Sequence, residues 1–283
     1  MENLGYYNGK YALIEEMQIP MQDRVCYFGD GVYDATCAAN HVIYALDEHI
    51  DRFYHSADLL KMNIPHTKEE LKDILTSMVK KVDSPTQFVY WQVTRGTAQR
   101  NHIFPDTSVK GNFWMMLTPV ESKQIREKIR LITQEDTRFL HCNIKTLNLI
   151  PNVMAAQQAE EAGAQEAVFH RGGRVTECAH SNVSILKDGV FITAPTDHLI
   201  LPGIARKHLI EMCRKNNITV DETPFNLKEL MQADEVIVSS SSNFCLSASH
   251  IDGKAVGGKA PELLLKLQDS LLEKFHKATG TVD

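Results

Sequence analysis

The sequence predicts an α+β protein with two domains. Many short strand-like segments are separated by turn residues and interleaved with amphipathic helices. They lack the regular alternation of strand and helix that is typical of a doubly wound sheet. A chain of 283 residues is long enough for one large or two modest domains. The strand pattern stops at Pro119, where a charged stretch begins, so we expect domains over residues 1–118 and 124–283 and a linker over 119–123.

Turn residues and helical spacing define the first elements. The runs Gly5-Tyr-Tyr-Asn-Gly9 and Phe28-Gly-Asp-Gly31 predict turns beside short strands. Over residues 46–62 the apolar spacing becomes helical, and four side chains fall on one face: Ile50, Phe53, Ala57 and Leu60. The first domain is therefore expected to begin with short strands followed by an amphipathic helix.

A second helix and two strands complete the first domain. Thr67 and Glu70 have the spacing of a capping box, which predicts a helix over residues 69–81. The segments 88–94 and 113–117 are mostly apolar and rich in β-branched or aromatic residues, so we expect two strands there.

The second half of the chain alternates its elements. A helix over residues 152–162 should end at Gly163, because glycine readily takes the left-handed conformation of a helix cap. The remaining elements are, in order, hairpins turning at 171–174 and 187–189, a helix after Gly203, and a strand at 235–238 that leads into a serine-rich loop.

Composition excludes several classes of protein. The net charge is −6 with both signs interspersed, which argues against a nucleic-acid-binding surface. The six cysteines are scattered without CxxC pairs and are typical of reduced cytosolic thiols. The N-terminus does not resemble a signal peptide, and no apolar run approaches the roughly 20 residues that span a bilayer. The 12 histidines are too dispersed to indicate a metal site. We therefore expect a cytoplasmic protein.

Two titratable side chains are candidates for covalent and electrostatic chemistry. Lys145 lies in the predominantly uncharged run Cys142-Asn-Ile-Lys-Thr-Leu-Asn148, and desolvation there would favour a free amine that attacks carbonyl groups. Glu177 lies between a hairpin strand and Ser181-Asn182, where its carboxylate could hold a protonated pyridine nitrogen. Each has an ordinary alternative, a surface lysine and a glutamate in a turn.

Two further segments are candidates for binding anions. Gly203-Ile-Ala-Arg206 opens a helix, whose first backbone N–H groups and positive dipole end suit a phosphate. Ser240 and Ser241 follow a strand and could add hydroxyl and amide donors. Arg100 and His102 are two residues apart, so both can face one side of an extended loop and bind a carboxylate. Each of these segments also has an ordinary alternative, because connections between strands, helices and loops often contain such residues without binding an anion.

The order of these residues resembles the signature of the class IV aminotransferases, the fold-type IV pyridoxal phosphate enzymes. From Glu177 the chain reads E-x-x-x-x-N, followed by Thr193 and then Leu201-Pro-Gly-Ile-Ala-Arg206. The upstream segments look like the D-amino acid branch of that family: Phe28-Gly-Asp-Gly-Val-Tyr33, Glu48-His-Ile-Asp-Arg52, Val93-Thr-Arg-Gly96 with Arg100 and His102, and Ile144-Lys-Thr-Leu-Asn148. The resemblance runs in one register from about Gly5 to the C-terminal helix.

The resemblance implies a fold and a reaction. The fold has a small N-terminal α/β domain and a larger C-terminal pseudo-barrel domain. The reaction is a ping-pong transfer of the amino group of a D-amino acid such as D-alanine to 2-oxoglutarate, pyruvate or another 2-oxo acid. The role implied is the supply of D-glutamate or D-alanine for bacterial cell-wall peptidoglycan.

The resemblance also implies roles for residues at the cofactor, pyridoxal 5'-phosphate. Lys145 is similar to the lysine that binds the cofactor as a Schiff base and moves the α-proton, and Glu177 to the carboxylate at the pyridine nitrogen. The cofactor phosphate is expected to be held by Arg52, by the amides of Ile204 and Ala205, and by Ser240 and Ser241.

The substrate α-carboxylate is expected to be bound by Tyr33, Arg100 and His102. In the family the last two reach over from the neighbouring subunit, which implies an obligate homodimer with active sites completed across the interface.

Three positions depart from the family pattern. Ala205 stands where a threonine usually adds a hydroxyl to the phosphate site, which puts cofactor affinity in question. Ser184 replaces an aromatic residue after Asn182, and we expect a change in packing there. Cys178-Ala-His180 replaces a small polar run and is expected to put a titratable imidazole near the cofactor.

Three other functions compete with this interpretation. Two share the fold: a branched-chain L-amino acid aminotransferase and a lyase that cleaves aminodeoxychorismate. Arg100 and His102 argue against both, because the pair resembles the carboxylate site of the D-specific branch. The third is a cofactor-binding protein without turnover, and the presence of both Lys145 and Glu177 argues against it.

Overall fold

The computed structural model describes residues 1–121 and 125–282. The chain forms two compact units. The first contains residues 1–122 together with 144–148 and 275–283, and the second contains 123–143 and 149–274. The division into domains at residues 118 and 124 stays a prediction, and the expected linker over 119–123 lies partly outside the described residues.

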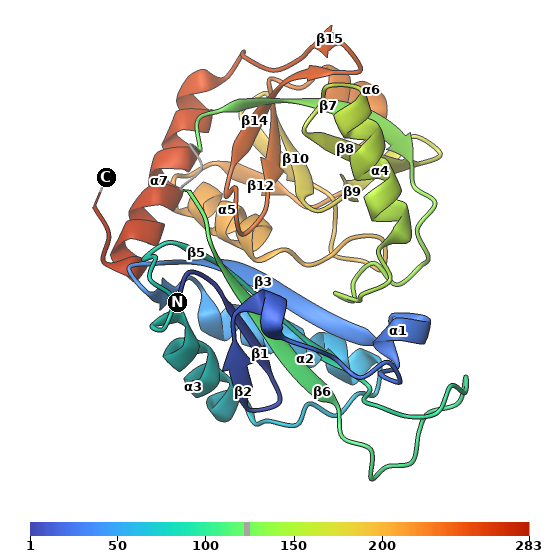
Figure 1. Cartoon of the computed structure of the whole chain (residues 1–283). Coiled ribbons are helices and arrows are strands. Elements are labelled where there is room, and N and C mark those ends of the chain that lie inside the picture. The colour runs from blue at the N-terminus through green and yellow to red at the C-terminus, as the bar shows by residue number, and fades with distance from the viewer. Residues whose placement is uncertain (122–124, 283) are drawn as a thin grey trace. The chain divides into compact units, whose positions relative to one another are not determined.

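The first unit is built on a six-stranded antiparallel sheet in the order β2-β1-β6-β5-β3-β4 (Figure 1). Asn8 and Gly9 have φ angles of 45° and 93°, and they form the turn between the first two strands that the sequence predicts. The strands are β1 (Leu4–Tyr7), β2 (Lys10–Ala12), β3 (Gly31–Ala39), β4 (Val42–Ile43), β5 (Gln87–Thr94) and β6 (Asn112–Pro119). Two short helical segments, η1 (Ile14–Glu16) and α1 (Val25–Phe28), precede β3.

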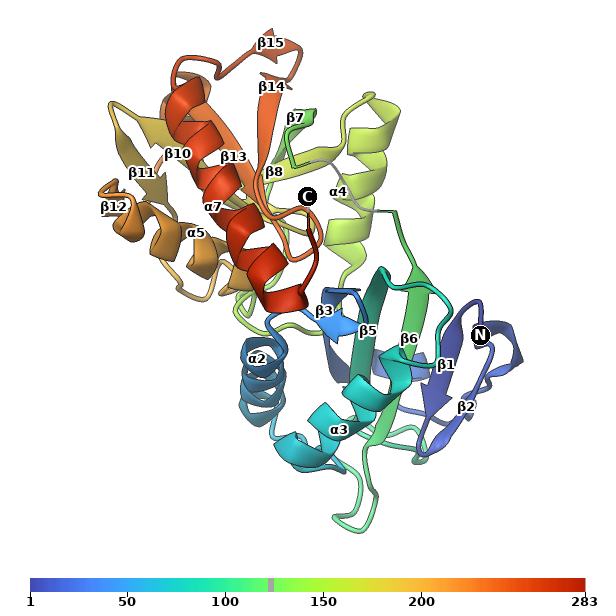
Figure 2. The same cartoon turned by 90° about the vertical axis from the view of Figure 1, so that its left-hand side faces the viewer.

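Helices α2 (Leu46–Leu59) and α3 (Lys68–Val79) cover one face of this sheet (Figure 2). Alternate strand residues point toward them, and the rings of Phe53 and Trp91, both fully buried, lie 6.2 Å apart. The predicted capping box is present: Thr67 Oγ1 accepts from the Glu70 amide at 3.2 Å, and Glu70 accepts from the Thr67 amide at 2.8 Å. The helix predicted from the apolar spacing and the helix predicted from the capping box are therefore both confirmed.

The second unit is built on a nine-stranded sheet in the order β12-β11-β10-β13-β14-β7-β8-β9, with β15 paired to β14. Strand β9 is last in this order and β10 is third, yet only residues 179–181 join them. The Cys178 amide donates to the Ser181 carbonyl at 2.7 Å in this turn, so the sheet curls back on itself. The strands are β7 (Lys128–Glu135), β8 (Glu166–Arg171), β9 (Arg174–Cys178), β10 (Asn182–Lys187), β11 (Val190–Thr193), β12 (Thr219–Asp221), β13 (Glu235–Ser239), β14 (Leu246–Ile251) and β15 (Lys254–Ala255).

Helices α4 (Ile150–Glu161), α5 (Ile204–Lys215) and α7 (Pro261–Thr279) cover the outside of the curled sheet, and apolar side chains, including Leu230 of α6 (Leu227–Met231), fill its inside. Val168, Val183 and Val236 belong to the inner core, although they come from three different strands. Helix α4 packs on β8. Leu209 of α5 and Leu267 of α7 share a third core with Phe191 of the sheet. Among the described residues, no helix is both long and apolar enough to cross a membrane.

The expected α+β class is confirmed, as are both glycine hairpins of the second half. Gly172 and Gly173 have φ angles of 53° and 87°, and Asp188 and Gly189 have 49° and 77°. Positive φ at both central residues is the requirement of a tight hairpin turn. The parallel pairing of β7 with both β14 and β8 has no counterpart among the sequence predictions.

Candidate functional site

Lys145 is fixed by its backbone in the first unit. Its carbonyl accepts from the Tyr33 amide at 2.9 Å, and its own amide donates to Ser56 Oγ of α2 at 3.2 Å. The next residue, Thr146, forms an isolated antiparallel bridge with Val32. The segment 144–148 therefore pairs with the edge of β3. These contacts fix the main chain of Lys145, whose side chain is half-buried.

An aromatic ring lies under the Lys145 amine. Lys145 Nζ is 4.2 Å from the centroid of the Tyr33 ring, and that ring stacks on Tyr90 with 5.4 Å between centroids. A cation over an aromatic face is attracted by its quadrupole. Two of the residues proposed from the sequence, Lys145 and Tyr33, thus lie in direct contact within this unit.

Arg52 is held by a buried carboxylate on β3. Its Nε and Nη2 donate to the two oxygens of Asp34 at 2.9 Å and 2.7 Å, and His49 Nδ1 contacts Asp34 Oδ1 at 2.7 Å. Complete burial would raise the pKa of Asp34, but the charges of Arg52 and His49 outweigh it and hold the pKa well below its usual range. Burial lowers the pKa of His49. Asp34 is therefore ionised, and it fixes the direction of the Arg52 guanidinium.

Arg100 and His102 share one aromatic ring in this unit. The Arg100 guanidinium lies 5.2 Å above the centroid of Phe28, and the His102 ring lies 5.1 Å from it. Both side chains are exposed. Within the described residues, neither forms a hydrogen bond or ion pair with Tyr33, the third member of the expected carboxylate site. Phe28 is the last residue of α1, so the end of this short helix contacts both basic side chains.

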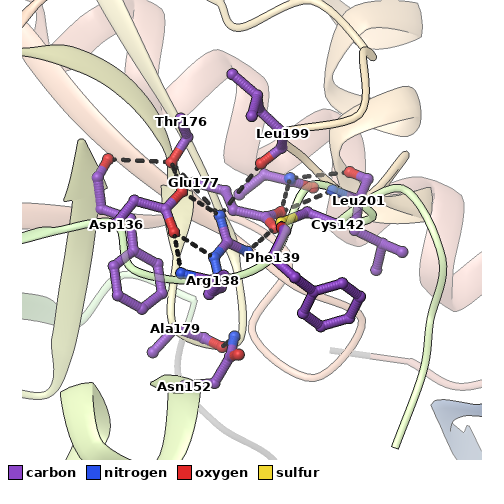
Figure 3. A network of polar contacts seen from close by, with 12 residues as sticks. Asp136, Arg138, Phe139, Cys142, Asn152, Thr176, Glu177, Ala179, Leu199 and Leu201 are labelled. Atoms are coloured by element: carbon purple, nitrogen blue, oxygen red, sulfur yellow. Dashed lines mark hydrogen bonds and ion pairs between the residues drawn. The ribbon is translucent and has the colours of Figure 1, made fainter. Parts of the chain in front are cut away.

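Glu177 lies at the end of β9 in the second unit, and three donors hold its carboxylate (Figure 3). Arg138 Nη1 donates to Oε1, while Asn182 Nδ2 donates to Oε2 at 3.1 Å and the Leu201 amide donates to Oε2 at 2.9 Å. The side chain is buried, and each of these bonds favours its charged form. A buried, ionised and oriented carboxylate is suited to holding a cationic nitrogen.

The spacing E-x-x-x-x-N has a structural reason. Glu177 is the next-to-last residue of β9 and Asn182 begins β10, so the four residues between them include the turn that closes the curled sheet. Asn182 Nδ2 also donates to the Leu201 carbonyl at 3.1 Å, and a Cβ on Gly203 would lie only 2.0 Å from Asn182 Oδ1. Residue 203 therefore has to be glycine. Through its hydrogen bonds to Glu177 and to Leu201, Asn182 joins Glu177 to the loop that leads into α5.

The N-terminus of α5 presents the amides of Ile204 and Ala205. Within the described residues, no side chain caps the helix at Gly203. Arg206 anchors the helix behind these amides: its Nε donates to Thr193 Oγ1 at 3.1 Å, and its Nη2 donates to the Ala194 carbonyl at 2.8 Å. Arg206 and Thr193 belong to the sequence signature, and they support the helix from the sheet.

The serine loop follows β13. Two hydrogen bonds to Ser240 close its turn. The Phe244 amide donates to the Ser240 carbonyl at 2.8 Å, and the Asn243 amide donates to Ser240 Oγ at 3.2 Å. Ser241 is half-buried in the same turn. Ser239, the last residue of β13, pairs with Asn182, and its buried hydroxyl has no hydrogen-bond partner among the described residues. A polar ligand at the end of β13 would satisfy that hydroxyl.

The departures from the family pattern have distinct surroundings. Ser184 is buried and donates to Thr193 Oγ1 at 2.9 Å, so the expected packing change includes a new hydrogen bond. His180 is largely exposed and contacts the buried carboxylate of Glu166. Burial raises the pKa of the Cys178 thiol well above its ordinary value, so this thiol is neutral at physiological pH. The placement of His180 near the cofactor stays a prediction.

Asp136 and Arg138 form a hydrogen-bonded network with Glu177 that was not found from the sequence. They lie in the loop after β7, and both are buried. An ion pair between residues two apart has no distinctive spacing, and Glu177, the partner of Arg138, is 39 residues away. A buried arginine can be recognised only once its partners are known, so the sequence contained no usable signal.

The side chains present match the groups of pyridoxal phosphate. Lys145 offers an amine, Glu177 a buried carboxylate for a ring nitrogen, and Arg52 a fixed cation for a phosphate. The amides opening α5 and the unsatisfied hydroxyl of Ser239 are donors that a phosphorylated ring compound can use. The donors present in each unit therefore fit groups of this cofactor: an amine and a fixed cation in the first unit, and a carboxylate, helix amides and a hydroxyl in the second.

Comparison with known proteins gives one consistent family. The sequence model of Amino-transferase class IV matches residues 31–251. A D-alanine aminotransferase of Listeria monocytogenes is 41% identical over 271 residues, which cover 94% of each chain. A D-alanine aminotransferase of Bacillus licheniformis is 36% identical over 278 residues, covering 96% of this chain and 98% of the relative. The solved branched-chain amino acid aminotransferase of Escherichia coli has a TM-score of 0.88 at 20% identity, covering 100% of this chain and 96% of the solved one. At that identity the solved structure shows the fold alone.

Proposed function

The chain belongs to the class IV aminotransferases, and from this we propose that it transfers the amino group of D-alanine and other D-amino acids to 2-oxoglutarate or another 2-oxo acid. The observation that carries the proposal is the similarity, at 35–41% identity over nearly the whole chain, to relatives named D-alanine aminotransferase. Two half-reactions follow one another in a ping-pong cycle. Among the described residues none of the six cysteines forms a disulfide, which supports a cytoplasmic location for the enzyme.

The cofactor is pyridoxal 5'-phosphate, whose electron-poor ring, when bound, stabilises negative charge at the substrate's α-carbon. Lys145 Nζ would hold the cofactor covalently and, once the substrate's amino group has replaced it there, would take the α-proton, because a free amine at that position is a general base. Glu177 holds a proton on the ring nitrogen. The contact of Lys145 Nζ with the Tyr33 ring and the three donors on Glu177 support these roles.

Arg52, with the amides of Ile204 and Ala205 and with Ser240 and Ser241, binds the cofactor phosphate. Support comes from the Arg52 guanidinium, which Asp34 fixes through two hydrogen bonds. Because the amide of Ala205 is present whatever its side chain, the missing threonine hydroxyl removes one donor and leaves the others.

Arg52→Ala is expected to weaken binding of pyridoxal phosphate by about 10- to 150-fold, since it removes a charge-assisted contact of ~1.5–3 kcal/mol. Titration of the apoenzyme with the cofactor, followed by tryptophan fluorescence, measures the dissociation constant. Arg126→Ala is the matched control, because Arg126 forms an exposed ion pair with Asp269 and should leave the affinity unchanged. Wild-type affinity in Arg52→Ala would place the phosphate elsewhere.

Tyr33, Arg100 and His102 bind the substrate α-carboxylate, and this determines the stereochemistry. The carboxylate position fixes one substituent of Cα, and the position of Lys145 Nζ fixes the direction in which the proton leaves. Exchanging D for L then exchanges the side chain and the hydrogen, so an L-isomer presents no Cα–H bond to the base. Discrimination should therefore appear in the chemical step as well as in binding.

A homodimer brings Arg100 and His102 to the site of a partner subunit. Two observations support this assignment. Both side chains are exposed, and in the part of the chain that the structure describes neither forms a hydrogen bond or ion pair with Tyr33. Large apolar side chains next to them, Ile103 at 70% and Phe104 at 55%, are exposed to solvent in the isolated chain. Such a surface is typical of a protein–protein interface.

Arg100→Ala should raise the apparent KM for D-alanine and for 2-oxoglutarate, since both carry an α-carboxylate. Mixing it with the inactive Lys145→Ala is expected to restore activity at low substrate concentration. Subunit exchange creates hybrid dimers in which one of the two sites combines the unmutated Arg100 of one subunit with the unmutated Lys145 of the other. Each variant alone, subjected to the same exchange, is the control. If exchange is demonstrated by mass spectrometry and activity does not return, Arg100 acts within its own subunit.

An activity panel of D- and L-amino acids with 2-oxoglutarate tests the function directly. D-Alanine should be the better substrate, and L-leucine should give little or no turnover with the purified, cofactor-loaded protein. A preference for L-leucine would reject the D-specific assignment and favour a branched-chain aminotransferase, the activity named for the structural neighbour.

A further inference from the structure

Arg138 lies between two carboxylates inside the second unit (Figure 3). Its Nε and Nη2 donate to the two oxygens of Asp136 at 3.0 Å and 2.9 Å, and its Nη1 donates to Glu177. Nη2 also donates to the Leu199 carbonyl at 3.1 Å. Arg138 is 7% exposed and all three of its nitrogens are bonded, so its guanidinium has a fixed orientation.

Asp136 is held from the other side. Arg171 Nε donates to Oδ2 at 3.2 Å, and Thr176 Oγ1 donates to the same oxygen at 3.1 Å. Burial would raise the pKa of Asp136, but the hydrogen bonds and charges of Arg138 and Arg171 outweigh it and lower the pKa. The four charged side chains therefore form a series of ion pairs with alternating sign, in the order Arg171, Asp136, Arg138, Glu177.

The alternation has an electrostatic consequence for Glu177. An arginine beside Glu177 without a counterion would cancel most of the charge of that carboxylate. Because Asp136 neutralises Arg138, the Asp136–Arg138 pair acts as a dipole whose positive end keeps Glu177 ionised. Enough negative charge then remains on Glu177 to attract a second cation.

We propose that Arg138, oriented by Asp136, is a positioning residue that keeps Glu177 ionised and aims its carboxylate at the ring nitrogen of the cofactor. This inference rests on the function proposed for Glu177. Arg138 and Asp136 act through Glu177 and touch neither substrate nor cofactor in this assignment. Arg138 supplies the donor, and Asp136 limits how much of the Glu177 charge that donor cancels.

Other titratable groups around Glu177 do not hold its carboxylate in this way. The thiol of Cys142 is a neighbour whose pKa burial raises to about 11, and burial raises the pKa of Cys178 further. Both thiols are therefore neutral at physiological pH. Arg171 acts on Asp136 and has no direct hydrogen bond to Glu177 among the described residues.

The first test uses the apoenzyme and so does not depend on turnover. Protein labelled with ¹³C at the glutamate carboxyl groups gives a resonance for Glu177, which is assigned by its loss in Glu177→Gln. In Arg138→Gln this carboxylate should titrate at a higher pH than in the wild type, because its charged donor is gone. In Asp136→Asn it should titrate at a lower pH, because the charge of Arg138 is no longer neutralised.

Conservative and control variants separate this role from a structural one. Arg138→Lys keeps the charge but loses the planar guanidinium group. In this variant the pH at which Glu177 titrates should return most of the way from its value in Arg138→Gln to that of the wild type. If Arg138 served only to pack the interior, the two substitutions would change the titration of Glu177 to the same extent. Arg174→Gln is the matched control, since Arg174 lies on the same strand as Glu177 but pairs with Asp197. Circular dichroism and thermal unfolding establish that each variant is folded.

The second test is a double-mutant cycle in the cofactor-loaded enzyme. Arg138→Gln alone should lower kcat about 10- to 150-fold, as expected for loss of one charge-assisted hydrogen bond. In a Glu177→Gln background it should have little further effect. Additive effects, or a Glu177 titration that does not move in Arg138→Gln, would overturn the proposal for Arg138. An unchanged kcat in Glu177→Gln with a moved titration would instead reject the role of Glu177 while leaving its coupling to Arg138 intact.

Discussion

Lys145→Ala is expected to lose both the visible absorption band of the bound cofactor and essentially all turnover. The substitution removes two functions at once, the covalent link through Nζ and the general base for the α-proton. General acid–base catalysis alone contributes roughly 10²- to 10⁴-fold, so we expect kcat to fall by at least that factor. The backbone contacts that hold residue 145, from Tyr33 and Ser56, do not involve its side chain, so the fold should survive.

The attachment can be located independently of activity. Reduction of the loaded wild-type enzyme with borohydride should fix the cofactor on one lysine, and peptide mass spectrometry should identify it as Lys145. Lys68→Ala is the matched control, because Lys68 belongs to the same unit and pairs with Asp51 at the surface. Retention of the band and of normal activity in Lys145→Ala contradicts the assignment.

Elements fixed by local chemistry were predictable from the sequence. Thr67 and Glu70 form the expected capping box, and the glycine turns at 172–173 and 188–189 need positive φ that few other residues adopt. Strand β7 was missed because Lys128 and Arg130 alternate with its buried residues Ile129 and Leu131 and make the segment read as a charged stretch. Its parallel partners, β8 and β14, are also distant in the sequence, and spacing alone cannot indicate such pairs.

The candidate site was predictable as a set of residues and not as a network. Lys145, Glu177 and Arg52 stand at positions where the family pattern has chemically necessary groups. The ion pairs that orient them connect segments far apart in the chain, such as Asp34 with Arg52 and Arg138 with Glu177. The same holds for the requirement of glycine at 203, which depends on the Asn182 side chain.

Glu177→Gln is the second substitution expected to have a large effect, and it should act on catalysis more than on cofactor binding. A neutral amide leaves the ring nitrogen without an anionic partner, so the nitrogen is protonated less often and withdraws less charge from the α-carbon. Loss of one preorganised electrostatic partner typically costs roughly 10²- to 10³-fold in kcat. The surroundings add to this, because the amide group of glutamine would direct N–H donors at Arg138, which is itself a donor. The phosphate contacts proposed for Arg52 and α5 are untouched, so affinity for the cofactor should fall much less.

Single-turnover kinetics with D-alanine and its α-deuterated form can measure this effect. The rate of α-proton removal should fall in Glu177→Gln, and a primary isotope effect should accompany it because that step is slowed directly. Glu235→Gln is the matched control: Glu235 is also a buried glutamate of the second unit, but it accepts from the amide of Ala260 at 3.1 Å and has no role at the site. Equal losses in both variants would indicate that a buried amide merely disturbs the fold. An unchanged single-turnover rate in Glu177→Gln would mean that another residue faces the ring nitrogen.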